Sequence, residues 1–287
     1  MAKKPDPISG LMSELQKKGI EYLRFEMPDL HGVSRSKTVP IDKVESYARH
    51  GLNFYGGVLG LDTASNVVPA SGLHTQQNYA DQLLFPDPGS LRVIPWLPNT
   101  ASVVCLGYWY DGAPLRAAPR FVFAELVKRA GELGYDVVLG HEYEYYLLDA
   151  ATKKRLYEGI HIFHTVRNHY TPFLDTLVPT LRAYGIDIIT HNCEYAGSQY
   201  ETNYGPGKNL AGVDKAFAFK NGMKELAHRS GLIASFMAKP FAGLSGSGCH
   251  LHVSLADKKT GKNAFNDPKA VNGLSAVGAA FAEGILA

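Results

Sequence analysis

The chain has 287 residues, of which 45% are hydrophobic and 20% are charged, and its formal net charge is +2. This length allows one large domain or two modest ones, and the composition is ordinary for a globular protein with a sizeable core. The small net charge and the lack of a long basic run argue against a nucleic-acid partner. No stretch has the ~20 apolar residues of a membrane span, and no signal-like apolar segment follows the start, so we expect no membrane partner. The 3 cysteines form no C-x-x-C pair, which predicts a reducing, cytoplasmic location.

The first 50 residues predict the opening of a small sheet domain. Apolar residues at helical spacing predict a helix over 8–18 that stops at Gly19. Alternating residues predict strands over 20–26 and 34–39, joined by a turn, and a short helix is expected over 42–50.

A long stretch without a clear pattern follows, from residue 51 to about residue 89. Long irregular stretches inside a compact domain are usually functional or mobile. Strands are then expected over 91–94 and 102–109, and a helix over 119–133, which begins at a proline and ends before Gly134.

The second half of the chain alternates between strands and helices. Residues 136–148 predict a strand, and residues 150–170 are poorly patterned. The remaining expected elements are helices over 170–184, 213–230 and 267–287 and strands over 186–190, 199–203 and 232–237.

Residues 239–255 combine a glycine-rich loop with an alternating strand. The loop, 239–248, holds three glycines and two serines and cannot be a regular helix or strand. In the strand that follows, His250, His252 and Ser254 share one face, and the apolar residues between them share the other. Such a strand suits metal ligands or phosphate contacts. It is equally consistent with an ordinary half-buried strand that carries two histidines on its polar face.

Two further segments carry paired acids. Glu142 and Glu144 are two residues apart on a predicted strand, so both face one way, where like charges repel. The pair is either a solvated strand face or a site for a shared cation. Glu194 and Glu201 flank a turn of small residues and could approach one point in space. A site of several carboxylates with one or two imidazoles suits Mg²⁺ or Mn²⁺ better than zinc.

Together, these three segments resemble the signature blocks of the glutamine synthetase family. They match its strand with two glutamates, its E-x-A-x-G-Q-x-E block (194–201) and its K-P-x-x-G-x-x-G-S-G-x-H-x-H-x-S block (239–254). The second match departs at Gly197-Ser198-Gln199, where the family has Pro-Gly-Gln. Order, approximate spacing and chemistry agree for all three blocks, and the resemblance runs from about Gly19 to the end.

The resemblance implies an α+β fold with two domains. Residues 1–112 would form a small N-terminal β-grasp-like domain with an interface loop. Residues 113–287 would form a glutamine-synthetase-type catalytic domain of antiparallel sheet plus helices. Family members continue well past this point, so we expect a catalytic domain that is incomplete at its C-terminus and has little or no activity alone. The family also implies a homo-oligomer of stacked rings with active sites between subunits.

The resemblance also assigns site residues. The positions matching ligands of the metal nearest glutamate are Glu144, Glu194 and Glu201. Those matching ligands of the metal on the ATP phosphates are Glu142 and His250. Nucleotide contacts fall on His252 and Ser254, and the glutamate-holding loop includes Ser245 and Gly246. The family usually has asparagine where Ser245 stands.

Tyr55 stands where ammonia-handling members of the family carry an aspartate that helps bind and deprotonate ammonium. Tyrosine carries no negative charge at neutral pH, so no catalytic residue is assigned in this segment. Asp62 or another acid could substitute, or the nucleophile is an organic amine lying against an aromatic wall. A shifted alignment of this loop is the third reading.

Three functions therefore remain open. The first is ATP-dependent ligation of the glutamate γ-carboxylate to an organic amine, through a γ-glutamyl phosphate, with Mg²⁺ or Mn²⁺ as cofactor. The second is glutamine synthesis from ammonia. The third is a catalytically inactive family member with a structural or regulatory role.

Overall fold

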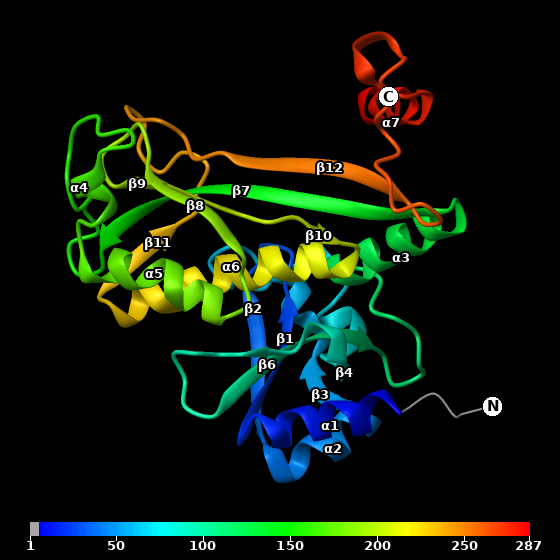
Figure 1. Cartoon of the computed structure of the whole chain (residues 1–287). Helices are drawn as coiled ribbons and strands as arrows, with labels where there is room; N and C mark the ends of the chain where they lie inside the picture. The colour runs from blue at the N-terminus through cyan, green and yellow to red at the C-terminus, as the bar shows by residue number, and fades with distance from the viewer. Residues whose placement is uncertain (1–5) are drawn as a thin grey trace. The chain divides into compact units, whose positions relative to one another are not determined.

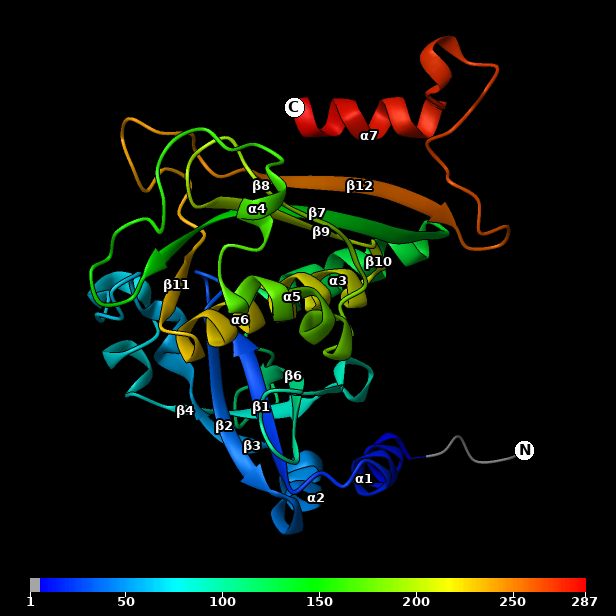
Figure 2. The same ribbon diagram turned by 60° about the vertical axis from the view of Figure 1, so that its left-hand side comes forward.

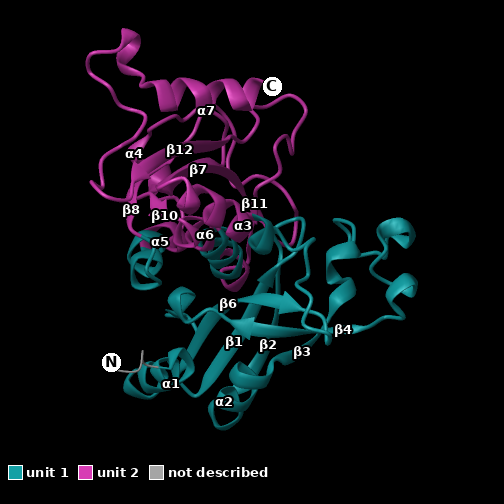
Figure 3. Cartoon of the chain, turned by 90° about the vertical axis from the view of Figure 1, so that its right-hand side faces the viewer, with its two compact units in different colours: residues 1–122, 176–186, 217–226 teal, residues 123–175, 187–216, 227–287 magenta. Residues whose placement is uncertain are grey.

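The computed structural model describes residues 6–287, which divide into two compact units (Figure 3). Among the described residues, unit 1 comprises 6–122, 176–186 and 217–226, and unit 2 comprises 123–175, 187–216 and 227–287. The chain thus returns twice to unit 1 after leaving it. The predicted domains, 1–112 and 113–287, stay a prediction.

Unit 1 is built on a six-stranded sheet with the order β2-β1-β6-β4-β3, and β5 pairs with β6 as well. Its strands are β1 (Tyr22–Pro28), β2 (Ser34–Pro40), β3 (Leu52–Tyr55), β4 (Asp81–Pro86), β5 (Arg92–Val93) and β6 (Thr100–Tyr108). The β1–β6 pair is parallel and the other pairs are antiparallel. Short 3₁₀ turns lie at Gly56–Gly60, Pro69–Ser71, Thr75–Gln77 and Pro88–Ser90.

Two helices, α1 (Pro7–Lys17) and α2 (Ile41–His50), complete the core of unit 1. Asp6 caps the N-terminus of helix α1, because its side chain accepts a hydrogen bond from the Ile8 amide at 3.2 Å, and Pro7 takes the first helical position. Leu11 and Leu15, one turn apart, are buried in the same apolar cluster as the inward-facing residues of β1.

Unit 2 is organised around the long strand β7 (Tyr135–Asp149), and all its strand pairs are antiparallel. The order is β10-β7-β9-β8, and β11 and β12 also pair with β7. Figure 2 shows β12 running alongside β7. The other strands are β8 (Ile188–Cys193), β9 (Gln199–Tyr204), β10 (Gly207–Lys208), β11 (Leu232–Ser235) and β12 (Cys249–Asp257).

The remaining helices are labelled in Figure 1. They are α3 (Pro119–Glu132), α4 (Thr165–Asn168), α5 (Pro172–Ala183), α6 (Leu210–Arg229) and α7 (Ala276–Leu286), with a 3₁₀ turn at Val271–Gly273. None of the helices in residues 6–287 is long and apolar enough to cross a membrane.

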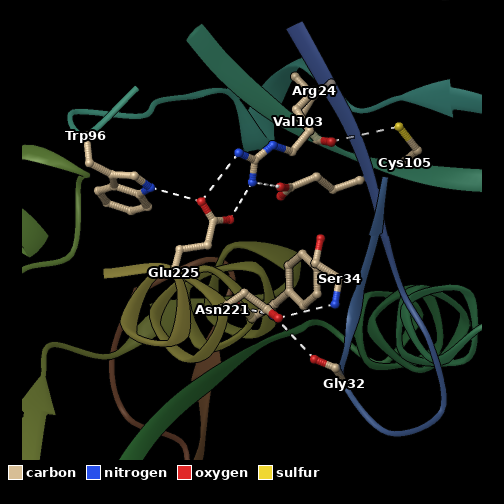
Figure 4. Close-up of polar contacts among 10 residues, drawn as sticks. Arg24, Gly32, Ser34, Trp96, Val103, Cys105, Asn221 and Glu225 are labelled. Carbon is tan, nitrogen blue, oxygen red and sulfur yellow. Dashed lines mark hydrogen bonds and ion pairs between the residues drawn. The ribbon is translucent and has the colours of Figure 1, made fainter. Parts of the chain in front are cut away.

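The middle of α6 belongs to unit 1, where a polar cluster fixes it (Figure 4). The Glu225 carboxylate accepts hydrogen bonds from the Arg24 guanidinium of β1 and, at 2.9 Å, from the Trp96 indole nitrogen. Arg24 also pairs with Glu26 at 3.2 Å. Within the same segment, Asn221 accepts a hydrogen bond from the Ser34 amide at 3.2 Å.

The mixed α+β class is confirmed, whereas the β-grasp character and the C-terminal incompleteness remain predictions. Three element predictions are wrong. Residues 51–89 are not irregular throughout, because β3 and β4 pair with each other inside this stretch. The strand expected over 91–94 is only two residues long. The last helix begins at Ala276, where the Ser275 hydroxyl accepts from the Gly278 amide at 3.1 Å and caps it.

Candidate functional site

The acidic residues of β7 and the histidines of β12 lie on one face of the unit 2 sheet. Glu142 and Glu144 are two apart on β7 and therefore share a face. In the antiparallel register, His250 of β12 lies directly opposite Glu142, and Glu201 of β9 lies opposite Glu144. Directly opposite residues project to the same side of a sheet. Three strands that are distant in sequence thus present their polar groups together.

Three of these side chains form a cluster that could hold a metal ion. Ligand atoms of Glu142, Glu201 and His250 all lie within 4.8 Å of one another. The Nδ1 atom of His250 lies 3.2 Å from Oε2 of Glu142. Partial burial raises the pKa of Glu201 to about 6, and the charges of Glu194, Glu142 and Glu144 add to the increase. A cation would relieve this repulsion, and the donor set of two carboxylates and one imidazole fits Mg²⁺ or Mn²⁺.

The cluster draws on both sets of predicted metal ligands, since Glu201 joins Glu142 and His250. The other two predicted ligands lie nearby with hydrogen-bonded carboxylates. The Glu144 carboxylate accepts a hydrogen bond from the Gln199 side-chain amide at 3.0 Å, and the Glu194 carboxylate accepts one from the Asn192 side-chain amide at 2.9 Å.

Gln199 is a site residue that sequence reasoning did not single out. It is only 1% exposed, and its Nε2 donates both to Glu144 and, at 2.8 Å, to the carbonyl oxygen of Gly246. Gln199 therefore links the Glu144 carboxylate of β7 to the backbone of the glycine-rich loop. Its place between Glu194 and Glu201 in the second signature block was the available signal.

The glycine-rich loop, residues 239–248, meets Glu144 through its backbone, because the Gly248 carbonyl accepts a hydrogen bond from the Glu144 amide at 3.1 Å. Two further hydrogen bonds hold the loop. The Tyr146 hydroxyl donates to the Ser245 carbonyl at 2.7 Å, and the Ser247 amide donates to the Ala238 carbonyl at 2.8 Å. A Cβ on Gly246 would lie 2.8 Å from the Ala238 carbonyl oxygen. Only glycine fits there without a shift of the backbone.

A cavity of about 510 Å³ opens beside the cluster. Its lining includes Gly140, Glu142, Asn203, Tyr204, His252 and Ser254. His252 lies with Nε2 3.1 Å from Oε1 of Glu142, and the Ser254 hydroxyl donates to Asn263 at 2.9 Å. The cavity has the volume of a small-molecule site, and it meets the acidic cluster at Glu142.

Comparison with known proteins decides the family. The protein-family model for the glutamine synthetase catalytic domain matches residues 116–287 of this chain. The chain belongs to the glutamine synthetase family. This result confirms the resemblance of the three signature blocks.

Relatives within the glutamine synthetase family carry different activities in their names. A glutamate–isopropylamine ligase from Pseudomonas sp. is 32% identical over 95% of this chain and 62% of its own length. A glutamine synthetase from Rhizobium meliloti (strain 1021) is 32% identical over 94% of this chain and 60% of its own. A solved GmaS/ADP complex superposes with a TM-score of 0.79 and 30% identity, over 92% of this chain and 59% of that one. The chain thus spans about 60% of the length of these relatives.

Tyr55, which the sequence resemblance matches to the family aspartate, has its hydroxyl in a hydrogen bond inside unit 1. The hydroxyl lies 2.5 Å from Nδ1 of His74, and Nε2 of that ring lies 2.8 Å from the Gly60 carbonyl oxygen. A carbonyl can only accept, so Nε2 carries the hydrogen and Nδ1 accepts from Tyr55. Partial burial raises the pKa of Tyr55, so the hydroxyl stays protonated at neutral pH. The carboxylate of the alternative acid, Asp62, accepts hydrogen bonds from the backbone amides of Ala64 and Asn66, each at 2.8 Å.

Proposed function

We propose that this glutamine synthetase family member joins the γ-carboxylate of glutamate to an amine, with ATP as co-substrate and γ-glutamyl phosphate as the intermediate. The observation that carries the proposal is the Glu142–Glu201–His250 cluster at the edge of a ligand-sized cavity. Attack of a carboxylate on the γ-phosphate brings two anions together, and bound Mg²⁺ or Mn²⁺ supplies the positive charge that this step needs.

The residues of the site would take separate roles in binding the cations, the nucleotide and glutamate. Glu142 and His250 would hold the cation on the ATP phosphates, and Glu144, Glu194 and Glu201 the cation beside glutamate. His252 and Ser254 line the cavity and would contact the nucleotide. The loop carrying Ser245 and Gly246 would hold glutamate and keep water from the acyl phosphate.

The amine is the finer part of the proposal, and we favour an organic amine over ammonia. Similarity does not separate them, because an isopropylamine ligase and a glutamine synthetase are equally identical to this chain. We favour an organic amine because of the chemistry at position 55, where a neutral phenol stands in place of the carboxylate that the resemblance implies. Its hydroxyl donates to His74, so the ring is what remains for an amine to contact. Asp62 is occupied by its own turn and is a poor substitute.

An inactive structural role is not favoured, because an inactive protein has no need to hold acidic groups in mutual repulsion. By its family we also propose a homo-oligomer of stacked rings with sites between subunits. The cytoplasmic location remains a prediction from cysteine usage.

The test is phosphate release from ATP by the full protein, with glutamate, Mg²⁺ and a panel of amines that includes ammonia, methylamine and isopropylamine. We expect phosphate release with an alkylamine and at least tenfold less with ammonia. Greater activity with ammonia than with every amine would identify a glutamine synthetase. No release with any of them, from a protein that binds Mn²⁺ and ATP, would favour the inactive member. Glu144→Ala should abolish release.

A further inference from the structure

The side chain of Asn203 carries a buried oxygen to which no described residue donates a hydrogen bond. Its Oδ1 is shielded from solvent and has no hydrogen-bond partner among the described residues. Buried polar atoms nearly always have a partner, so such an atom in a folded protein needs an explanation. No signature block includes Asn203.

The position of Asn203 suggests what the oxygen is for. On β9 it lies two residues beyond Glu201 and therefore on the same face. In the register with β7 it lies directly opposite Glu142. It also lines the 510 Å³ cavity. Its amide is thus the neighbour of two members of the Glu142–Glu201–His250 cluster, at the point where the cluster meets the cavity.

We propose that Asn203 is an additional oxygen donor to the cation that Glu142 and His250 would hold, acting either directly or through a water bound to that cation. The inference rests on the proposed metal site and adds a residue to it. Amide carbonyl oxygens are hard, neutral donors of the kind that Mg²⁺ accepts, and Mg²⁺ keeps several of its waters in proteins. The cation's shell would then supply the partner that Oδ1 lacks.

A neutral donor also suits the local charge. Glu142, Glu144 and Glu194 already act on Glu201, and a fourth carboxylate around it would increase the repulsion without a metal. The amide adds a ligand oxygen at no cost in charge. As a positioning group, Asn203 would determine how firmly the cation is held.

The experiment measures Mn²⁺ binding to the purified full chain by electron paramagnetic resonance of free Mn²⁺, with water proton relaxation to count bound waters. We expect Asn203→Ala to weaken Mn²⁺ binding about 10- to 100-fold, the range for loss of a supporting ligand contact. Asn203→Asp, which keeps an oxygen at this position, should bind at least as tightly as the wild type. An unchanged water count in Asn203→Ala indicates a water-mediated role, and one additional water indicates direct ligation.

Two controls make the result decisive. Asn53→Ala removes an exposed asparagine from β3 and should leave Mn²⁺ binding unchanged. Glu142→Gln should lose Mn²⁺ binding; if it binds as the wild type does, the proposed metal site itself fails. If Glu142→Gln loses binding and Asn203→Ala does not, only the role of Asn203 is overturned. Equal weakening by Ala and Asp would also overturn it, because the amide nitrogen would then be the working atom. Thermal unfolding with EDTA identifies any variant that fails to fold.

Discussion

The carboxylate of Glu144 and the backbone of Gly248 approach each other so closely that a side chain at position 248 would collide with the acid. A Cβ built on Gly248 would lie 2.8 Å from Oε1 of Glu144 and 3.3 Å from Nε2 of His250. The Glu144 amide donates to the Gly248 carbonyl at 3.1 Å, which fixes the two backbones together. The Glu144 carboxylate can therefore lie where it does only because residue 248 has no side chain.

Gly248→Ala should therefore displace Glu144 or His250 and weaken Mn²⁺ binding about 10- to 100-fold, because both are proposed ligands. Gly243→Ala in the same loop is the matched control, since a Cβ there meets nothing within 4 Å. Titration of both variants with Mn²⁺ checks the expectation. Equal affinities in the two variants would show that Glu144 tolerates the methyl group and is not held as described.

The Tyr55–His74 contact predicts a loss of stability on removal of one hydroxyl. His74 is only 1% exposed, and Tyr55→Phe would leave its Nδ1 without the donor that it has now. An unsatisfied buried acceptor costs about 1–3 kcal/mol, so the free energy of unfolding should fall by that amount. Urea unfolding measures it.

Tyr79→Phe is the control for this variant, because Tyr79 stacks on Tyr55 but is 57% exposed. It should change the unfolding free energy by less than about 0.5 kcal/mol. If Tyr55→Phe is equally mild, the hydroxyl is not held by His74 and remains free to meet an amine. The proposed contact of the amine with the ring alone would then lose its support.

The residues of the site could be predicted because strands have a period of two. The spacing of Glu142 and Glu144, and of His250 and His252, places each pair on one strand face from sequence alone. The pairing of the two strands could not be predicted, because it joins residues 108 positions apart. Register also decides which predicted ligands meet, and it brought Glu201 to the pair Glu142 and His250.

Other features of the fold depend on neighbours that no local pattern reveals. Strands β3 and β4 were missed because a strand of four to six residues is defined by its partner, here across a long connection. The alternation in β12 predicted an apolar rear face, yet Leu251 on that face is 56% exposed. The return of α6 to unit 1 is decided by single contacts such as Arg24 with Glu225.

The Arg24–Glu225 pair predicts a large effect from a residue far from the candidate site. The side chain of Arg24 is 15% exposed, and Glu225 accepts from both Arg24 and Trp96. Glu225→Ala would leave a desolvated guanidinium with Glu26 as its remaining ion-pair partner among the described residues. Removal of one member of a buried pair costs about 3–5 kcal/mol, and partial exposure of Glu225 reduces this to roughly 2.

Glu45→Ala is the control for this prediction, because Glu45 pairs with Arg49 one helical turn away on an exposed surface. Such pairs contribute about 0–1 kcal/mol. Denaturant unfolding of the two variants should therefore differ clearly. Similar losses would mean that the Arg24–Glu225 pair contributes no more than a surface contact.

Glu26 makes the stability of the protein depend on pH. Burial raises its pKa from the ordinary 4.5 to about 7; the charge of Arg24 opposes the increase and that of Glu225 adds to it. A carboxyl with a higher pKa in the folded state binds its proton more tightly there. Its effect on stability is therefore most favourable below pH 4.5, declines as the pH rises towards 7, and is constant above. The full change is on the order of 3 kcal/mol, at about 1.4 kcal/mol per pKa unit.

Glu26→Gln isolates this contribution, because the amide keeps the shape of the side chain and does not titrate. We expect the free energy of unfolding of the variant to change less than that of the wild type between pH 5 and 8, so that their difference grows as the pH rises. Urea unfolding at four pH values measures both curves. Parallel curves would mean that Glu26 keeps an ordinary pKa in the folded protein. The Arg24 guanidinium would then offset the cost of burying the charge.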